Sequence, residues 1–260
     1  MKKVVILGEA LLRLSPPGRN RIVGSPLFEV NYGGSEANVA VALSQYGVDT
    51  SFVSKLPSHE LGDAAIGKLR EFGVNTSHIA RGGDRMGIYY LENGYSVRPS
   101  KVVYDRKNSA LSEACVEEFN LDEIFRGKDL FHVSGITLGI SEKGFQLAKA
   151  FMKAAKERGL KISFDFNYRS KLWSIEQAKE KFEKVLEYVD IAFAGHLDFT
   201  RILGIPMVRK WEDSDLHEYF EDLYRKASGK YHFEWIVSSF RDVKSASKND
   251  YQGIIYNGDQ

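Results

Sequence analysis

Cysteine is almost absent from the sequence. The 260 residues include a single one, Cys115, which excludes an intrachain disulfide and every zinc site that needs two thiolates. Proteins without disulfides are typical of reducing compartments, so the sequence favours a cytoplasmic location. The six histidines form no HExxH pair, and no two of them stand four residues apart. A zinc site carried on one helix is therefore unsupported.

Long apolar runs and an excess of one charge are missing as well. No stretch approaches the ~18 apolar residues that span a bilayer. Lys and Arg total 36 and Asp and Glu total 35, which gives a net charge of +1 and no bulk attraction for nucleic acid or an acidic membrane. We therefore expect neither partner. The two common nucleotide motifs, GxxxxGK[ST] and a GxGxxG after the first strand, are also missing, so any ATP site must use another architecture.

What is present is an alternation of short apolar runs and amphipathic stretches. It predicts strands at 3–8, 51–56, 130–134, 161–166, 189–194, 235–239 and 253–256, and helices at 36–46, 61–72, 142–158, 175–187 and 214–227. This order is typical of an α/β fold with a mainly parallel sheet and helices on both faces. The stretches 87–93 and 100–106 differ, because they read as an exposed β-hairpin.

In a parallel sheet, ligands bind beyond the carboxyl ends of the strands. The segment YGGSEANVAVALSQYG (32–47) places two glycines before a helix start, where backbone N–H groups can meet a ligand. Ser35 is the expected N-cap and Asn38 a possible ligand contact. A turn followed by an amphipathic helix, with no ligand, accounts for the sequence of residues 32–47 equally well.

Two further segments carry candidate ligand groups. In DFNYRSKLW (165–173), Asp165, Asn167 and Arg169 alternate and would project from one side of a strand end toward a polyhydroxylated or anionic ligand. A surface salt bridge is the plain alternative. Tyr104 and Arg106, with Tyr90, would make the hairpin a lid over a small polar ligand, although cross-strand aromatic pairing is equally common there.

Together these segments resemble the ribokinase-like, or PfkB-type, carbohydrate kinases, and among them those that phosphorylate 2-keto-3-deoxygluconate. The resemblance rests on GEALLRLSPP (8–17), YGGSEANVAVALSQYG (32–47), KLPSHELGDAA (55–65), RPSKVVYDR (98–106), FHVSGIT (131–137) and DFNYRSKLW (165–173). It implies one three-layer α/β domain over residues 1–260, with lid strands inserted at about 10–35 and 86–108. It also implies ATP and Mg²⁺ as cofactors and a homodimer joined through the lid strands.

The resemblance also assigns site residues. The substrate-contacting positions match Gly34, Asn38, Tyr90, Tyr104, Arg106 and Arg169, and the nucleotide-contacting positions match Asn167, Arg169, Ser239 and Arg241. On this reading the two arginines neutralise the carboxylate of a sugar acid. A neutral sugar such as fructose is the alternative substrate, and it would leave both arginines without an anion.

The sequence departs from the family pattern at two places. An N-x-x-E motif that organises magnesium and phosphate is replaced by Gly195-His196-Leu197-Asp198, so no residue is assigned as a metal ligand. The late GAGD motif, which supplies the anion hole and the catalytic Asp, does not occur. We therefore expect a C-terminally truncated, incomplete domain with no catalytic residue of its own and little turnover. A non-catalytic sugar-acid-binding protein is the second reading.

Overall fold

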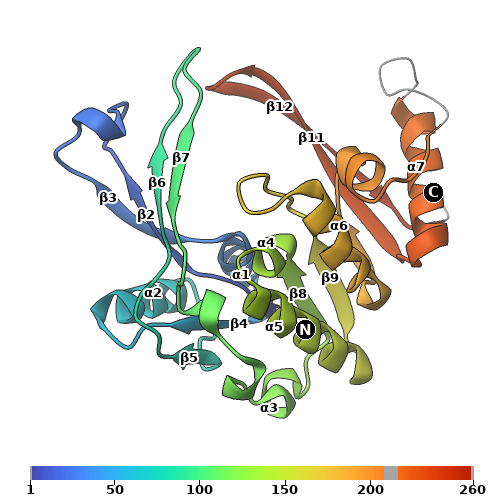
Figure 1. Ribbon diagram of the computed structural model, residues 1–260, viewed down its shortest axis with the longest axis horizontal. Coiled ribbons are helices and arrows are strands. Elements are labelled where there is room, and N and C mark those ends of the chain that lie inside the picture. The colour runs from blue at the N-terminus through green and yellow to red at the C-terminus, as the bar shows by residue number, and fades with distance from the viewer. Residues whose placement is uncertain (1, 208–215, 259–260) are drawn as a thin grey trace.

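Two β-sheets organise the protein, as the computed structural model shows (Figure 1). The structure describes residues 2–207 and 216–258. The larger sheet has eight strands in the order β12-β11-β10-β9-β8-β1-β4-β5, and the smaller has four in the order β3-β2-β6-β7.

The larger sheet is parallel except at one edge, where β12 runs antiparallel to β11. Its strands are β1 (Lys3–Leu7), β4 (Asp49–Leu56), β5 (Ile79–Arg81), β8 (Leu130–Ser134), β9 (Lys161–Asp165), β10 (Ile191–Phe193), β11 (Trp235–Ser245) and β12 (Lys248–Tyr256). Short β-branched and aromatic runs such as KVVIL and KISFD form these strands because they suit a sheet buried on both faces. The carboxyl ends of the parallel strands meet at one edge.

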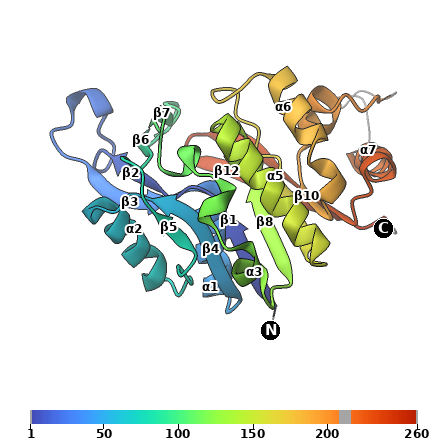
Figure 2. The same ribbon diagram turned by 60° about the horizontal axis from the view of Figure 1, so that its bottom comes forward.

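Helices cover both faces of this sheet. They are α1 (Ser35–Gln45), α2 (Glu60–Glu71), α3 (Leu121–Phe125), α4 (Gly135–Gly139), α5 (Glu142–Glu157), α6 (Ile175–Glu183) and α7 (Leu216–Tyr231). Alternate residues of β1 show the division: Val5 and Leu7 belong to a core with α5, α6 and α7, whereas Val4 and Ile6 belong to a core with α1 and α2. Figure 2 shows α5 across one face, with α1 behind the sheet. The predicted three-layer, mainly parallel fold is confirmed.

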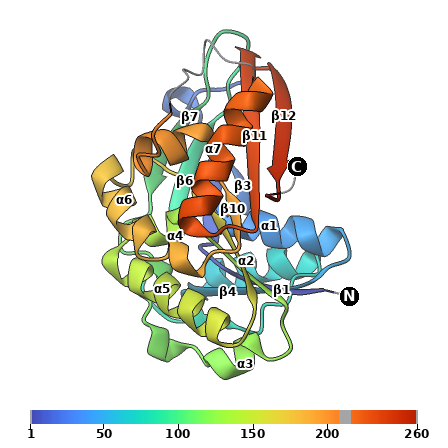
Figure 3. The same cartoon turned by 90° about the vertical axis from the view of Figure 1, so that its right-hand side faces the viewer.

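One part of the second face is open. Ala192 and Ile236 face the core beneath α5–α7, so their neighbours Phe193 and Trp235 point to the side of α1. These two side chains are 40% and 41% exposed. In Figure 3 the hairpin β11–β12 stands beside α7, which covers its other face.

The four-stranded sheet rises from the ligand edge and is the lid. Its strands are β2 (Leu11–Ser15), β3 (Glu29–Gly33), β6 (Ile88–Glu92) and β7 (Lys101–Asp105). The order β3-β2-β6-β7 contains two antiparallel pairs, and a parallel pair, β2 with β6, lies between them. The predicted hairpin at 87–93 and 100–106 is thus confirmed as β6 and β7.

The tip of the lid touches the tip of the β11–β12 hairpin (Figure 1). The amide of Ala246 donates a hydrogen bond of 2.9 Å to the carbonyl oxygen of Ser96. In return, the amide of Ser96 donates a 3.3 Å bond to Oγ of Ser247. Ser96 and Ser247 are 151 residues apart in the chain. The two tips therefore form a bridge above the ligand edge.

Three local expectations were wrong. Helix α1 begins at Ser35 itself, and the N-cap is Gly34, which has no side chain to cap it. The Ser35 hydroxyl instead accepts a hydrogen bond from Asn167. The stretches 235–239 and 253–256 are parts of one long hairpin rather than two separate short strands. The helix expected at 175–187 ends at Glu183, and a 3₁₀ turn follows at Leu186–Tyr188. The predicted start of the next helix, residues 214–215, lies outside the described residues.

Candidate active site

Three adjoining cavities run along the ligand edge, from the lid to the β11–β12 hairpin. The first, beneath the lid, has a volume of about 320 Å³. The second, at the ends of β9 and β10 and beside the first half of β11, has about 620 Å³, and the third, between α7 and the hairpin, about 1020 Å³. Arg169 lines both the first and the second, and Ser239 lines both the second and the third. The three therefore form one trough.

The cavity beneath the lid gathers most of the predicted substrate residues. It is lined by Glu9, Leu11, Gly34, Ser35, Glu36, Asn38, Tyr89, Tyr104, Arg106, Ile136 and Arg169. Five of the six predicted residues are in this set, from the α1 start, the lid and the loop after β9. Their shared position is a geometric finding, and their roles in binding stay predictions.

Gly34 is needed where α1 meets the strand-end loop. A Cβ on this residue would overlap the backbone carbonyl oxygen of Glu9. Glycine therefore lets the first turn of α1 pack directly on the backbone at Glu9. The close approach places the N-terminal N–H groups of α1 at the floor of the cavity, where they favour an acceptor or an anion.

Tyr90 does not lie in this cavity, and its predicted position was wrong. In the lid, Tyr89 stands directly opposite Tyr104, whereas Tyr90 stands opposite Val103. Because neighbouring residues of a strand point to opposite faces, Tyr90 is turned to the outer face, where its ring meets Phe28 edge-on at 5.8 Å. Tyr89 takes its place, with its ring centroid 6.0 Å from that of Tyr104.

A buried ion pair that the sequence did not reveal joins the lid to the body. Nη2 of Arg106 bonds to Oε2 of Glu9, and the two side chains are only 9% and 4% exposed. Oε1 of Glu9 and Nε of Arg106 have no partner among the described residues. The charge of Arg106 is thus balanced by Glu9 before any ligand binds.

Glu36 is a second buried carboxyl group in the cavity wall. Its Oε1 accepts hydrogen bonds from the Ser134 hydroxyl and the Thr137 hydroxyl, both at 2.7 Å, and from the Ser134 amide at 3.2 Å. Burial raises the pKa of Glu36, and these hydrogen bonds oppose the rise. The group therefore fixes α1 against the start of α4.

Two aspartates dominate the second cavity. Burial, reinforced by the nearby carboxylates of Glu36 and Asp198, raises the pKa of Asp165 to about 6. Burial likewise raises the pKa of Asp198 to about 6, although the Gly195 amide donates to it at 2.7 Å. Asp198 also begins a π-helical turn, Asp198–Ile202, a feature that is frequent at functional sites. Arg169 is the cation that lowers both pKa values.

Asn167 connects the two cavities. Its backbone is in the left-handed region with φ of 39°, which asparagine tolerates better than most residues. Its Nδ2 donates to Ser35 Oγ at 2.7 Å and to Asp165 Oδ2 at 3.0 Å. The loop after β9 is thereby fixed to the first turn of α1.

The predicted nucleotide residues Ser239 and Arg241 lie on β11 and line the third cavity. Nε of Arg241 donates to Asn249 Oδ1 at 2.9 Å, and its guanidinium lies 5.8 Å from the centre of the Tyr251 ring. The hairpin itself therefore holds this arginine, at the opposite end of the trough from the lid.

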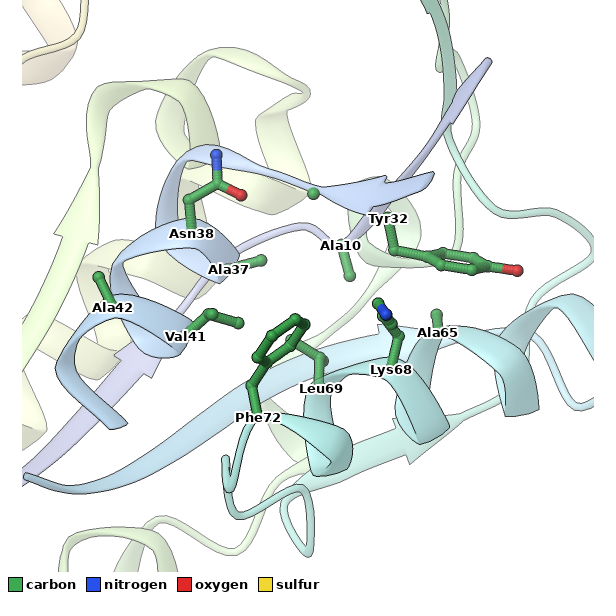
Figure 4. Close-up of a pocket in the computed structure, with 11 residues that line it drawn as sticks. Ala10, Tyr32, Ala37, Asn38, Val41, Ala42, Ala65, Lys68, Leu69 and Phe72 are labelled. Carbon is green, nitrogen blue, oxygen red and sulfur yellow. The ribbon is translucent and has the colours of Figure 1, made fainter. Parts of the chain in front are cut away.

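A separate cavity lies behind the α1 start, between α1 and α2 (Figure 4). It has a volume of about 230 Å³, and its walls are mostly apolar, as Val41, Leu69 and Phe72 in the close-up show. Asn38 lines both this cavity and the one beneath the lid. Its few polar groups suit a sugar acid poorly, so we place the site on the lid side.

Within residues 2–207 and 216–258, no helix combines the length and the apolar character that crossing a bilayer requires. The same residues contain no group of three or more His, Cys, Asp or Glu side chains that could hold a metal ion.

Comparison with known proteins decides the family. A family model described as pfkB family carbohydrate kinase matches residues 1–228. The chain belongs to this family. The recognition made from the sequence is therefore confirmed.

Relatives of this PfkB chain include several sugar-acid kinases. The crystal structure of a 2-dehydro-3-deoxygluconokinase from Thermotoga maritima is 43% identical, with a TM-score of 0.95 over 100% of this chain and 77% of that one. A 2-dehydro-3-deoxygalactonokinase from Haloferax volcanii is 34% identical over 90% of this chain and 70% of its own length. A 2-dehydro-3-deoxygluconokinase from Thermoproteus tenax is 30% identical over 97% of this chain and 78% of its own length.

Proposed function

We propose that the chain binds 2-keto-3-deoxygluconate beneath the lid and serves as an ATP-dependent kinase of this sugar acid. The observation that supports it best is the cavity of Tyr89, Tyr104, Arg106 and Arg169 over the α1 start. The ligand has a carboxylate, a 2-keto group and hydroxyls, and phenol, guanidinium and backbone N–H groups are the partners that these oxygens require. The similarity to 2-dehydro-3-deoxygluconokinases points to the same substrate class, because 2-dehydro-3-deoxygluconate is another name for 2-keto-3-deoxygluconate.

The nucleotide would occupy the rest of the trough, since sugar kinases of this family use ATP. Asn167 and Arg169 would meet its phosphates, and Ser239 and Arg241 its far end at the hairpin. Arg169 lines both cavities, so it would lie between the sugar acid and the transferred phosphoryl group. Phosphoryl transfer depends mainly on such positioning and on charge stabilisation.

Asp165 and Asp198 fit a role beside Mg²⁺. Both carboxylates have pKa values raised to about 6 by burial, so a cation between them and the phosphates would relieve their mutual repulsion. Mg²⁺ is commonly held by one or two carboxylates together with substrate phosphates, where it neutralises their charge. The proposal assigns no proton acceptor to the sugar hydroxyl, because the GAGD motif does not occur in these 260 residues.

The outer face of the lid would join two copies of the chain into a homodimer. Its apolar side chains include Val30 and Val103, which are 57% and 44% exposed. Exposed apolar side chains on a four-stranded sheet are removed from water when a second sheet covers them, which favours association. A cytoplasmic location is consistent with the exposed free thiol of Cys115.

Isothermal titration tests the substrate. The 260-residue chain should bind 2-keto-3-deoxygluconate with a Kd of about 1 mM or tighter, since about 1 mM is the upper end of the KM range that is usual for enzymes. Its C4 epimer, 2-keto-3-deoxygalactonate, and D-fructose should bind more weakly. Failure of a folded sample to bind either acid, or tighter binding of fructose, would refute the assignment.

A second titration addresses the chemistry. A non-hydrolysable ATP analogue with Mg²⁺ should bind the same sample, and Arg241→Gln should weaken it without changing the affinity for the sugar acid. A coupled assay with ATP then separates a kinase from a protein that only binds the sugar acid, because only the kinase consumes ATP in proportion to the acid added.

A further inference from the structure

The charges around the lid cavity do not favour an anion as strongly as the two arginines suggest. Arg106 is already balanced by Glu9 in a buried pair. Arg169 acts on Asp165 and Asp198, whose pKa values it lowers. Glu36 adds a second carboxyl group to the wall of the lid cavity, beside Glu9. A sugar carboxylate in this cavity therefore meets no surplus positive charge from its walls.

The inner face of the lid supplies a cation that is not balanced. Arg13 of β2 stands beside Asn31 of β3 on one side and beside Tyr89 of β6 on the other. Tyr89 in turn stands opposite Tyr104 of β7. Residues in register point to the same face, so Asn31, Arg13, Tyr89 and Tyr104 form one row across all four lid strands. We call it the lid row.

Two members of the lid row, Tyr89 and Tyr104, line the cavity. Adjacent strands lie ~4.8 Å apart, so the Arg13 backbone is one strand away from that of Tyr89. The phenol oxygen of Tyr89 approaches Gly33, since a Cβ on that glycine would lie 3.6 Å from it. The Tyr89 side chain therefore leans toward the α1 start and away from Arg13, its register partner on β2.

Arg13 has no anionic partner in the described part of the chain. No hydrogen bond or ion pair joins it to another described residue, and its Nε is buried without a partner. Buried polar atoms are nearly always satisfied, so the unpartnered Nε leaves Arg13 with a donor that a ligand could use. Its guanidinium is the group that binds a carboxylate through two parallel N–H bonds.

We propose that Arg13, within the lid row, binds the carboxylate of the sugar acid and thereby distinguishes acids from neutral sugars. This inference rests on the proposed function. It changes the role of Arg106, which instead fixes the lid to Glu9 and presents its remaining N–H groups to the uncharged oxygens of the ligand.

Titration with two matched ligands tests the proposal. 2-Keto-3-deoxygluconate carries the carboxylate, and 3-deoxy-D-fructose has the same carbon chain with an alcohol in its place. Arg13→Met keeps the apolar stem and removes the charge. It should weaken binding of the acid about 10- to 100-fold, the loss expected for a charge-assisted hydrogen bond, and leave the neutral ligand unchanged. Arg13→Lys should lose less, since it keeps the charge without the bidentate geometry.

Lys101→Met is the matched control. Lys101 stands opposite Glu92, in the same register set as Tyr90, so it lies on the outer face of the same sheet. Its removal takes one positive charge from the lid and should leave both affinities unchanged. Circular dichroism and a thermal melt of each variant establish that it is folded.

Three results would overturn the assignment. Equal weakening of both ligands by Arg13→Met would make Arg13 a structural residue of the lid. Unchanged binding of the acid by Arg13→Met would show that Arg106 or Arg169, and not Arg13, binds the carboxylate. Loss of the dimer in sedimentation, with acid binding retained, would place Arg13 at the subunit interface. Absence of acid binding by the unmodified chain would instead refute the proposed function itself.

Discussion

The carboxyl groups at the two ends of the trough differ in how well other protein groups neutralise them. Under the lid, Glu9 bonds to Arg106, and Glu36 accepts three hydrogen bonds from Ser134 and Thr137. At the ends of β9 and β10, Asp165 and Asp198 line the same cavity, and burial raises both pKa values to about 6. The carboxyl groups at the sugar end are thus compensated within the protein, whereas those at the nucleotide end store negative charge.

This contrast shows what each end needs from its ligand. A compensated site is preorganised, because its side chains keep their positions before the ligand arrives. A site with two crowded carboxylates gains stability when a cation binds between them. We therefore expect sugar-acid binding to change the structure little, and nucleotide binding to depend strongly on the accompanying cation.

Breaking the compensation at the sugar end should have the largest effect. Arg106→Met leaves Glu9 buried without its partner, which should lower the free energy of unfolding by about 3–5 kcal/mol. Urea denaturation measures the change. Arg85→Met removes a comparable pair with Asp105, but that pair is exposed, so less than about 1 kcal/mol should be lost. Equal losses in both variants would show that the buried Glu9–Arg106 pair stabilises the protein no more than the exposed Arg85–Asp105 pair does.

Relieving the nucleotide end should stabilise the protein. The pKa of Asp198 is raised from 3.8 to about 6, so its favourable contribution is present below pH 3.8 and is lost as the pH rises through 6. Asp198→Asn removes this loss and keeps an acceptor for the Gly195 amide. The variant should match the unmodified protein near pH 4 and exceed its unfolding free energy by about 2 kcal/mol at pH 7.5.

Thermal and urea denaturation across this pH range check the sign. Asp250→Asn on the exposed hairpin is the control and should show no such pH-dependent gain. A destabilised Asp198→Asn variant at pH 7.5 would mean that the carboxylate is compensated by a group other than Arg169, and the contrast between the two ends would disappear.

The smallest effect sharpens the assignment within the lid. Tyr89→Phe removes a hydroxyl that faces the cavity, so the affinity for the sugar acid should fall about 3- to 10-fold, as expected for one neutral hydrogen bond. Tyr90→Phe changes the outer face and should leave the affinity unaltered. The reverse order in a calorimetric titration would restore the assignment made from the sequence.

Much of the fold follows from local signals in the sequence. Apolar runs mark the strands of the parallel sheet, and Ser141 and Gly159 mark the ends of α5: Ser141 caps it through the Gly144 amide, and Gly159 has a φ of 75°. The hairpin β6–β7 was also predicted. The long hairpin β11–β12 was not, because its outer half is polar and lacks an apolar face to mark it.

The site was harder to predict because it depends on register and on distant contacts. Tyr89 and Tyr90 are adjacent and chemically identical, so only the pairing of Tyr89 with Tyr104 decides which one faces the ligand. The Glu9–Arg106 pair joins residues 97 positions apart. Glu9 directly follows the first strand and its stop, a position that signals the ligand edge, but its partner could not be read from the sequence.

The bridge between the lid tip and the hairpin has a consequence for experiments on motion. The amide of Ala246 donates to Ser96 across the top of the trough, and the structure holds this proton only while the two tips touch. The rate at which this amide exchanges with deuterium therefore reports how often the two tips separate above the trough. If ligands enter by raising the lid, saturating sugar acid should slow exchange at this one amide more than at its neighbours in the hairpin.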